Sequence, residues 1–187
     1  MKKKVIHIIP FFSQRSSHEW QERGFKDKEH ALQWENRVCG IACMKMVFNL
    51  HDKYKDQLFA SLIEEMEEKG VYKLGVGCIH HKIAKEFNDR GIDAGRMKIE
   101  DIQEFKRYID QDNIFIVSIG PAFIDNQKTG HLVPVIGYVE EDGKIISLIV
   151  HHTSSYGERE WEAVEIDVEK FTNHFSGNTI RVRLYNA

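Results

Sequence analysis

The stretch QWENRVCGIACMKMVF, Gln33 to Phe48, decides the fold, because a cysteine separates a polar segment from an apolar helical pattern. The residues after it that recur at helical spacing are Ile41, Ala42, Met44, Val47 and Phe48, which predicts a buried helix from about 38 to 50. Cys39 would stand at the start of this helix, where the helix N-terminus lowers a thiol pKa. Gly40 lets another chain or a substrate backbone approach closely. Cys39 is therefore a candidate nucleophile, although most helical cysteines are only small buried residues.

Two further residues carry the chemistry that a thiolate nucleophile needs. Acyl transfer requires hydrogen-bond donors for the developing oxyanion, commonly a backbone N–H and a side-chain amide. Gln33, six residues before Cys39, can supply that amide. A base is also needed, and His131 in TGHLVPVIGY follows a glycine at the head of an apolar strand. Taken singly, each of these residues is more commonly a structural or solvent-exposed residue than a catalytic one. Only their combination indicates catalysis.

The order of predicted elements indicates an α+β fold in which a helical N-terminal half packs on a C-terminal antiparallel sheet. A strand near Val5 to Ile9 precedes a polar, turn-rich stretch to about Asn36. The helix that contains Cys39 and two more helical patterns follow, the last ended by Gly91, and then a short strand and a helix at 100–109. Beyond Asp112 the chain is rich in branched residues and is predicted to form strands separated by turns such as EEDGK. The predicted strands are IFIVSIG, HLVPVIGYV, KIISLIV and TIRVRLY. A short helix, DVEKFTNHF, is predicted before the last strand.

Length and composition limit the function further. A chain of 187 residues is expected to form one domain, residues 1–187. Its 26 Lys and Arg against 29 Asp and Glu give a net charge of −3, which excludes a typical nucleic-acid binder. No apolar run is long enough for a membrane span, and the start MKKKVIHIIPFF reads as a strand rather than a signal peptide. Three cysteines cannot all pair, so a reducing cytoplasm is expected.

The motifs QWENRVCGIACMKMVF and GHLVPVIGY, with the acidic-glycine turn after them, resemble the papain-like cysteine peptidases of the bacteriocin-processing, double-glycine leader type and their stand-alone relatives. The resemblance runs from IIPFFSQ near the start to VEKFTNHFSG near the end. It implies that Cys39 attacks the substrate, that His131 acts as base and that Gln33 completes the oxyanion hole. It also implies a peptide or protein substrate and no cofactor. Cys43 is expected to be core, because Arg37 stands six residues before it and cannot replace an amide.

The chain departs from the family pattern at the residue that orients the histidine. An Asp or Asn is expected on the strand after the hairpin, but this stretch reads IVHHTSS. The position falls on His151 or His152, and His152 is the interpretation we prefer. A neutral imidazole there would stabilise an imidazolium less than a carboxylate does. Asp125 and Asn126 could substitute if their loop folds back.

Three features of the sequence admit a second interpretation. Gln14 in PFFSQ competes with Gln33, because some relatives place the oxyanion glutamine at the start of the domain. The pairs in CIHHK and VHHTS could suggest zinc, but adjacent histidines do not readily reach one ion. An impaired site would make the protein a peptide- or leader-binding module, and the same fold could also carry a small-molecule amide or acyl transferase. The oligomeric state is not indicated.

Overall fold

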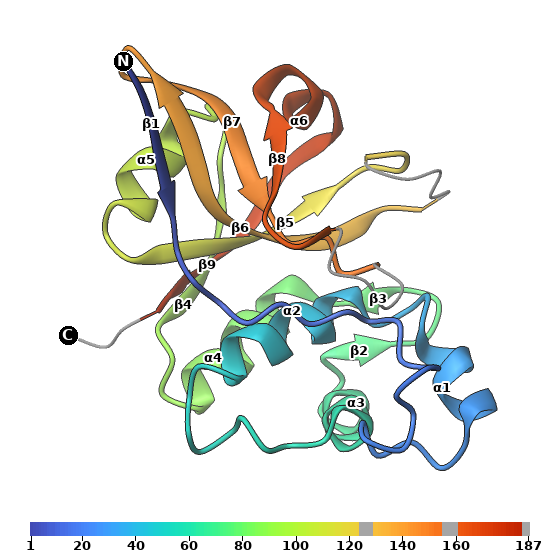
Figure 1. Ribbon diagram of the computed structural model, residues 1–187. Helices are drawn as coiled ribbons and strands as arrows, with labels where there is room; N and C mark the ends of the chain where they lie inside the picture. The colour runs from blue at the N-terminus through green and yellow to red at the C-terminus, as the bar shows by residue number, and fades with distance from the viewer. Residues whose placement is uncertain (124–128, 155–160, 185–187) are drawn as a thin grey trace.

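An antiparallel sheet forms one half of the molecule and a group of helices the other (Figure 1). The structure is a computed structural model that describes residues 1–123, 129–154 and 161–184. The helices are α1 (Lys28–Trp34), α2 (Cys39–Phe48), α3 (Phe59–Glu68), α4 (His80–Asp89), α5 (Glu104–Ile109) and α6 (Val168–His174). The strands are β1 (Lys2–Ile6), β2 (Tyr72–Lys73), β3 (Gly77–Cys78), β4 (Ala94–Lys98), β5 (Asn113–Ile119), β6 (His131–Glu141), β7 (Lys144–Val150), β8 (Val164–Asp167) and β9 (Phe175–Arg183).

The strands of the large sheet lie in the order β4-β9-β5-β6-β7-β8, and every neighbouring pair is antiparallel. The first half of β6 pairs with β5, whereas β1 pairs with its second half, from Gly137 to Glu141. The turn between β6 and β7 has positive φ at both Asp142 (49°) and Gly143 (83°), as a two-residue type I′ hairpin requires. The predicted EEDGK hairpin is therefore confirmed.

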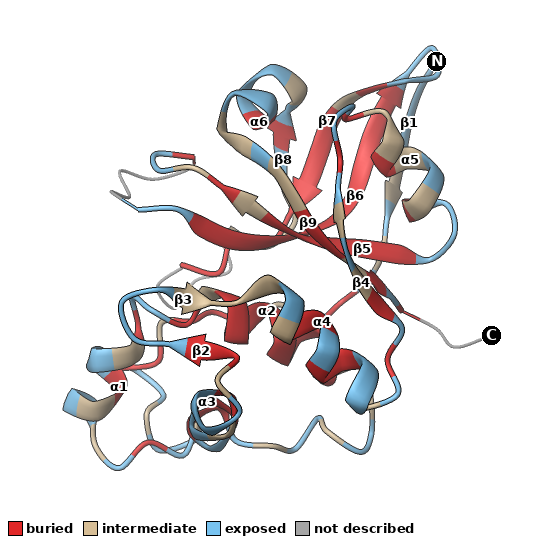
Figure 2. Ribbon diagram, turned by 180° about the vertical axis from the view of Figure 1, so that it is seen from behind, coloured by how far each residue is buried: buried red, intermediate tan, exposed pale blue. Residues whose placement is uncertain are grey.

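Both faces of the sheet are covered, because side chains of opposite parity on each strand enter two separate cores. On β5, Ile114 and Ile116 belong to the core shared with α2, α3 and α4, and Phe115 and Val117 belong to the core shared with α5 and α6. Figure 2 shows the resulting buried strands in the middle of the molecule. α2 contacts β6 directly, and the starts of the two elements lie side by side, since a Cβ on Gly40 would lie 2.9 Å from Leu132 Cδ1.

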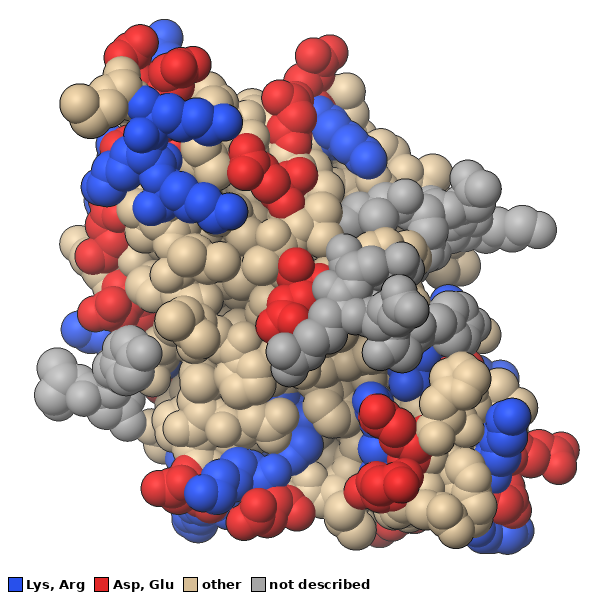
Figure 3. Space-filling model, viewed as in Figure 1, with Lys and Arg blue, Asp and Glu red and all other residues tan. Residues whose placement is uncertain are grey.

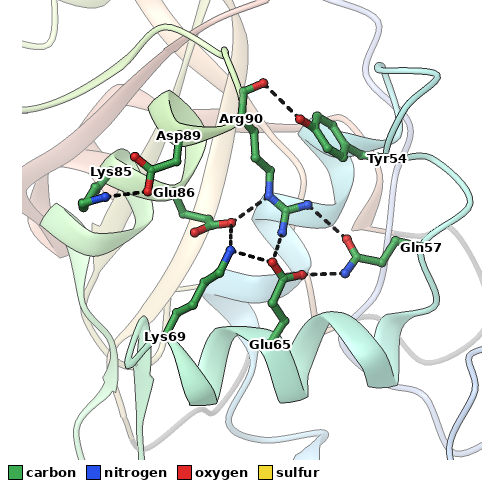
Figure 4. Close-up of polar contacts among 8 residues, drawn as sticks. All are labelled: Tyr54, Gln57, Glu65, Lys69, Lys85, Glu86, Asp89 and Arg90. Carbon is green, nitrogen blue, oxygen red and sulfur yellow. Dashed lines mark hydrogen bonds and ion pairs between the residues drawn. The ribbon is translucent and has the colours of Figure 1, made fainter.

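A charged network ties the helical half together (Figure 4). The Arg90 guanidinium lies 2.7 Å from both Glu86 and Glu65, and the Lys69 ammonium bridges the same two carboxylates at 2.7 and 2.6 Å. The guanidinium also lies over the ring of Phe48, 4.4 Å from its centroid, at the end of α2. This network connects α3 and α4 to α2, the helix that carries Cys39.

The surface carries both signs of charge in close alternation. Figure 3 shows lysines over β1 next to acidic residues. Lys3 lies 4.0 Å from Glu140, and the N-terminal ammonium lies 2.8 Å from Asp142. Over residues 1–123, 129–154 and 161–184, no helix has the length and apolar character needed to cross a membrane.

The α+β prediction is confirmed, with three local differences. The first strand spans Lys2–Ile6 rather than Val5–Ile9. The stretch predicted as turn-rich contains α1, whose first turn is capped by Asp27 through a 2.7 Å hydrogen bond from the backbone N–H of His30. The β2–β3 hairpin and β8 were not predicted, because strands of two to four residues carry too little alternation to recognise.

Candidate active site

Cys39 and His131 line the same cleft, of about 770 Å³, at the junction of the helical half and the sheet. Gln14, Arg15 and Ser154 also line it, and the β2–β3 turn, residues 74–77, forms another part of the wall. The cleft thus gathers residues from the chain start, from α2 and from the sheet. The predicted nucleophile and the predicted base meet in it.

Cys39 is the first residue of α2 and is half-buried. Its sulfur faces the backbone N–H groups of Gly40 and of Leu132, the residue after His131, and these donors favour a thiolate. Burial has the larger effect and raises the pKa of the Cys39 thiol above its usual value. The Cys39 side chain is therefore a thiol at neutral pH.

The residues after Cys39 explain how α2 is seated. A Cβ on Gly40 would lie 2.7 Å from Cys78 Cβ and 2.9 Å from Leu132 Cδ1, so only glycine lets the helix approach β3 and β6 this closely. Cys43 is fully buried and its thiol donates to the Leu132 carbonyl at 3.4 Å, in agreement with its predicted place in the core.

In the part of the chain that the structure describes, no group of three or more His, Cys, Asp and Glu residues could hold a metal ion.

His131 is the first residue of β6 and is 7% exposed. Its Nε2 lies 2.8 Å from the Thr153 hydroxyl and 3.2 Å from the Ser154 hydroxyl. Burial lowers the pKa of His131 to about 3, and repulsion from His152 and Arg15 acts in the same direction. The imidazole is therefore neutral over the physiological range and can accept a proton.

The structure places Gln14 in the cleft and Gln33 outside it. Gln33 is an exposed residue of α1 and lines a separate hollow with Lys26, Asp27, Glu29 and His30. Gln14 is 3% exposed and is held on both sides of its amide. Its Nε2 donates to the Glu35 carbonyl, and its Oε1 accepts from the Thr153 hydroxyl at 2.9 Å. Of the two glutamines considered, only Gln14 lines the cleft with Cys39 and His131.

Glu35 fixes the loop that carries Gln14. Its carboxylate, buried with the residue at 2% exposure, accepts from the backbone N–H groups of Ser16 and Ser17 at 3.0 and 2.7 Å. The backbone N–H of Gln14 donates to the Thr153 carbonyl at 2.7 Å. The segment after β1 is thereby connected to the end of α1 and to the segment after β7.

The two histidines considered for the orienting position lie differently. The His152 ring is fully buried, with its centroid 4.8 Å from that of His131 and an angle of 35° between the planes. The same ring also makes a T-shaped contact with Trp161. His151 Nδ1 accepts from the Ala163 N–H at 2.9 Å, and its Nε2 lies 3.2 Å from the Ile9 carbonyl. His152 is thus the histidine adjacent to His131.

Sequence reasoning did not consider the two hydroxyls that contact His131. Thr153 and Ser154 follow the two histidines directly in IVHHTSS, so their position after β7 was the available signal. An orienting group was sought among acids, amides and imidazoles only. Asp125 and Asn126, which were also candidates, lie outside the described residues.

Comparison with known protein families gives a match over most of the chain. The sequence pattern of the Peptidase C39 like family matches residues 9–178. The chain belongs to this family. Family membership assigns it to the cysteine peptidase class of hydrolases and confirms the resemblance inferred from the motifs. Comparison with curated proteins gives no significant match.

Solved structures share the fold of this chain. The peptidase domain of Streptococcus ComA, a bifunctional ABC transporter involved in quorum sensing, is 19% identical with a TM-score of 0.54, over 79% of this chain and 93% of that one. A protein from Bacillus anthracis described as a C39-like peptidase is 14% identical with a TM-score of 0.60, over 99% of this chain and 100% of that one. At these identities the similarity shows the fold, which is papain-like.

Proposed function

We propose that this C39-like chain hydrolyses a peptide amide bond through a thioester on Cys39, with His131 as base and Gln14 in the oxyanion hole. The observation that carries the proposal is the meeting of these three side chains in one cleft. Gln14 takes the role that the six-residue spacing suggested for Gln33, since only Gln14 lines the cleft.

The first half of the reaction starts from a neutral pair. Because the Cys39 thiol has a raised pKa and the His131 imidazole a lowered one, both groups are neutral at rest. The proton therefore passes from sulfur to imidazole only as the sulfur attacks the substrate carbonyl. The carbonyl oxygen becomes an oxyanion, for which the Cys39 N–H and the second Nε2 hydrogen of Gln14 are the donors. The imidazolium then protonates the leaving amine, the carbon–nitrogen bond breaks, and a thioester remains.

The second half regenerates the enzyme. His131 accepts a proton from a water molecule, and the resulting hydroxide equivalent attacks the thioester carbonyl. The carbon–sulfur bond breaks, the proton returns from His131 to Cys39, and the acid product leaves. The same oxyanion donors serve both halves.

A peptide-binding module is the second candidate function, and one observation favours it. Among the described residues, the hydrogen-bond partners of His131 are two hydroxyls, both at Nε2, and no carboxylate. Such a site stabilises an imidazolium less than a complete triad does. A module of this kind would hold a peptide in the cleft without cutting it.

The experiment that separates the two candidates is a peptide-library digest followed by mass spectrometry. We expect wild-type protein to cleave peptides and a Cys39→Ala variant to cleave none while still binding them. A thioester adduct on Cys39, trapped at low pH, would identify the acyl-enzyme. Binding by both proteins with no cleavage by either would leave the binding module and refute the peptidase.

A further inference from the structure

We infer that Thr153 is the positioning residue that orients His131 and connects the base to the oxyanion glutamine, in the role for which the resemblance predicted an Asp or Asn. This inference rests on the proposed function. It follows from a chain of hydrogen bonds that runs from the Glu35 carbonyl through Gln14 and Thr153 to His131.

The first step fixes the amide of Gln14. The backbone carbonyl of Glu35 can only accept a hydrogen bond, so the Gln14 atom facing it must be Nε2. Oε1 therefore points to the other side, 2.9 Å from the Thr153 hydroxyl. The orientation of the amide is thus determined by chemistry, with one Nε2 hydrogen used and one left for the cleft.

The second step fixes the hydroxyl of Thr153. An amide oxygen cannot donate, so the single Thr153 proton must point to Gln14 Oε1. The hydroxyl oxygen then faces His131 Nε2, 2.8 Å away, with only lone pairs. It can accept a hydrogen bond from that nitrogen but cannot donate one.

The third step fixes the tautomer of His131. The shorter contact, 2.8 Å to Thr153, is a hydrogen bond only when Nε2 carries the ring proton and donates it, so we assign the proton there; the Ser154 hydroxyl lies at 3.2 Å on the same nitrogen. Nδ1 is left as the basic nitrogen. Among the residues that the structure describes, Nδ1 makes no hydrogen bond that would occupy its lone pair. The tautomer that the proposed function requires is therefore set by Thr153.

This arrangement does not change when the base is protonated. Imidazolium keeps its Nε2–H, so the bond to Thr153 persists while the proton arrives on Nδ1, and no group must turn in the transition state. Thr153 is fully buried, and its carbonyl accepts from Gln14 N–H at 2.7 Å and from the Ser13 hydroxyl at 3.2 Å. Because its hydroxyl is uncharged, it orients the ring without raising the His131 pKa as a carboxylate would.

The test compares Thr153→Val, which keeps the shape and removes the hydroxyl, with Thr153→Ser, which keeps the hydroxyl. Thr179→Val is the matched control, because Thr179 is also fully buried and its hydroxyl donates to a carbonyl outside the cleft, that of Met97 at 3.1 Å. We expect Thr153→Val to lower kcat roughly tenfold, the value of one neutral hydrogen bond, with little change in KM. Thr153→Ser and Thr179→Val should stay within about twofold of wild type.

A second readout does not depend on turnover. Nitrogen NMR of labelled imidazoles distinguishes the two tautomers, and we expect His131 to carry its proton on Nε2 in wild type and in Thr153→Ser, and to lose this preference in Thr153→Val. An Nδ1–H tautomer in wild type would overturn the inference, even if no variant folds. Equal kcat and an unchanged tautomer in Thr153→Val would also overturn it. An Nε2–H tautomer that depends on the hydroxyl, in a protein that cleaves no peptide, would support the positioning role and refute the peptidase.

Discussion

A neutral, buried His131 makes the stability of the protein depend on pH in a way that can be measured without a substrate. The unfolded chain binds a proton on this imidazole below its ordinary pKa of 6.5, whereas the folded site resists protonation down to about 3. Where the unfolded state binds more protons, stability falls as pH falls. His131 should thus cost the wild type ~1.4 kcal/mol of unfolding free energy for each pH unit below 6.5, a loss that ends near pH 3.

The perturbation is His131→Asn, and the assay is urea unfolding of wild type and variant at pH 7.5 and pH 4.5. Between these values the wild type should lose about 2 to 3 kcal/mol more than the variant, because the variant has no imidazole there to protonate. Taking the difference between the two proteins cancels the other titrating groups. His81→Gln, which removes an imidazole from the exposed face of α4, is the control and should follow the wild type.

Parallel pH dependence in wild type and His131→Asn would refute the reasoning. A gain in stability of the wild type relative to the variant on acidification would refute it more directly. Such a gain would show that the folded site prefers the imidazolium. In that case Cys39 and His131 would rest as an ion pair, and the proton transfer proposed for the attack would already have occurred.

Three further outcomes follow from the geometry. Gln14→Ala should lower kcat by roughly 10²–10³, whereas Gln33→Ala should leave steady-state turnover unchanged; the reverse order would restore the six-residue spacing argument. Arg90→Met should lower the free energy of unfolding, measured in urea, by about 2–3 kcal/mol. Loss of a sole buried partner costs ~3–5 kcal/mol, and the loss here is smaller because Lys69 still bridges the two carboxylates. An unchanged free energy of unfolding would show that the network is dispensable. The cleft lining includes Arg15 and Arg37 and, among described residues, no carboxylate. Arg37→Glu should therefore lower the ratio of the iodoacetate to the iodoacetamide alkylation rate at Cys39, whereas Arg183→Glu, an exposed change on β9, should leave this ratio unchanged. The same ratio in wild type and in Arg37→Glu would contradict a positive cleft.

The fold was predictable from the sequence where its periodicity is long. The helix that begins at Cys39 and the strands that begin at Asn113, His131 and Lys144 bury regular apolar patterns of seven or more residues. The β2–β3 hairpin, with two residues in each strand, has no period to detect. It is held by tertiary contact with α2 and α3 rather than by local preference.

The site was predictable only in part, because linear spacing does not show where a loop returns. Cys39 and His131 start regular elements, and the sequence therefore indicated both. Gln14 reaches the cleft because its backbone N–H pairs with the Thr153 carbonyl, 139 residues further along the chain, and no local pattern encodes that contact. Gln33 has the expected separation from Cys39, yet α1 directs it elsewhere.

The charge state of the resting site follows from the groups that the described residues place around His131. A carboxylate beside His131 would raise its pKa and favour a thiolate on Cys39, since an opposite charge nearby stabilises the charged form. The described site offers His131 two hydroxyls and the repulsion of His152 and Arg15 instead, in a buried position. Burial without a compensating charge favours the neutral form of both the thiol and the imidazole. In the proposed peptidase Cys39 would then be deprotonated during attack, and we expect the tautomer of His131, which we assign to Thr153, to govern the rate in place of a preformed ion pair.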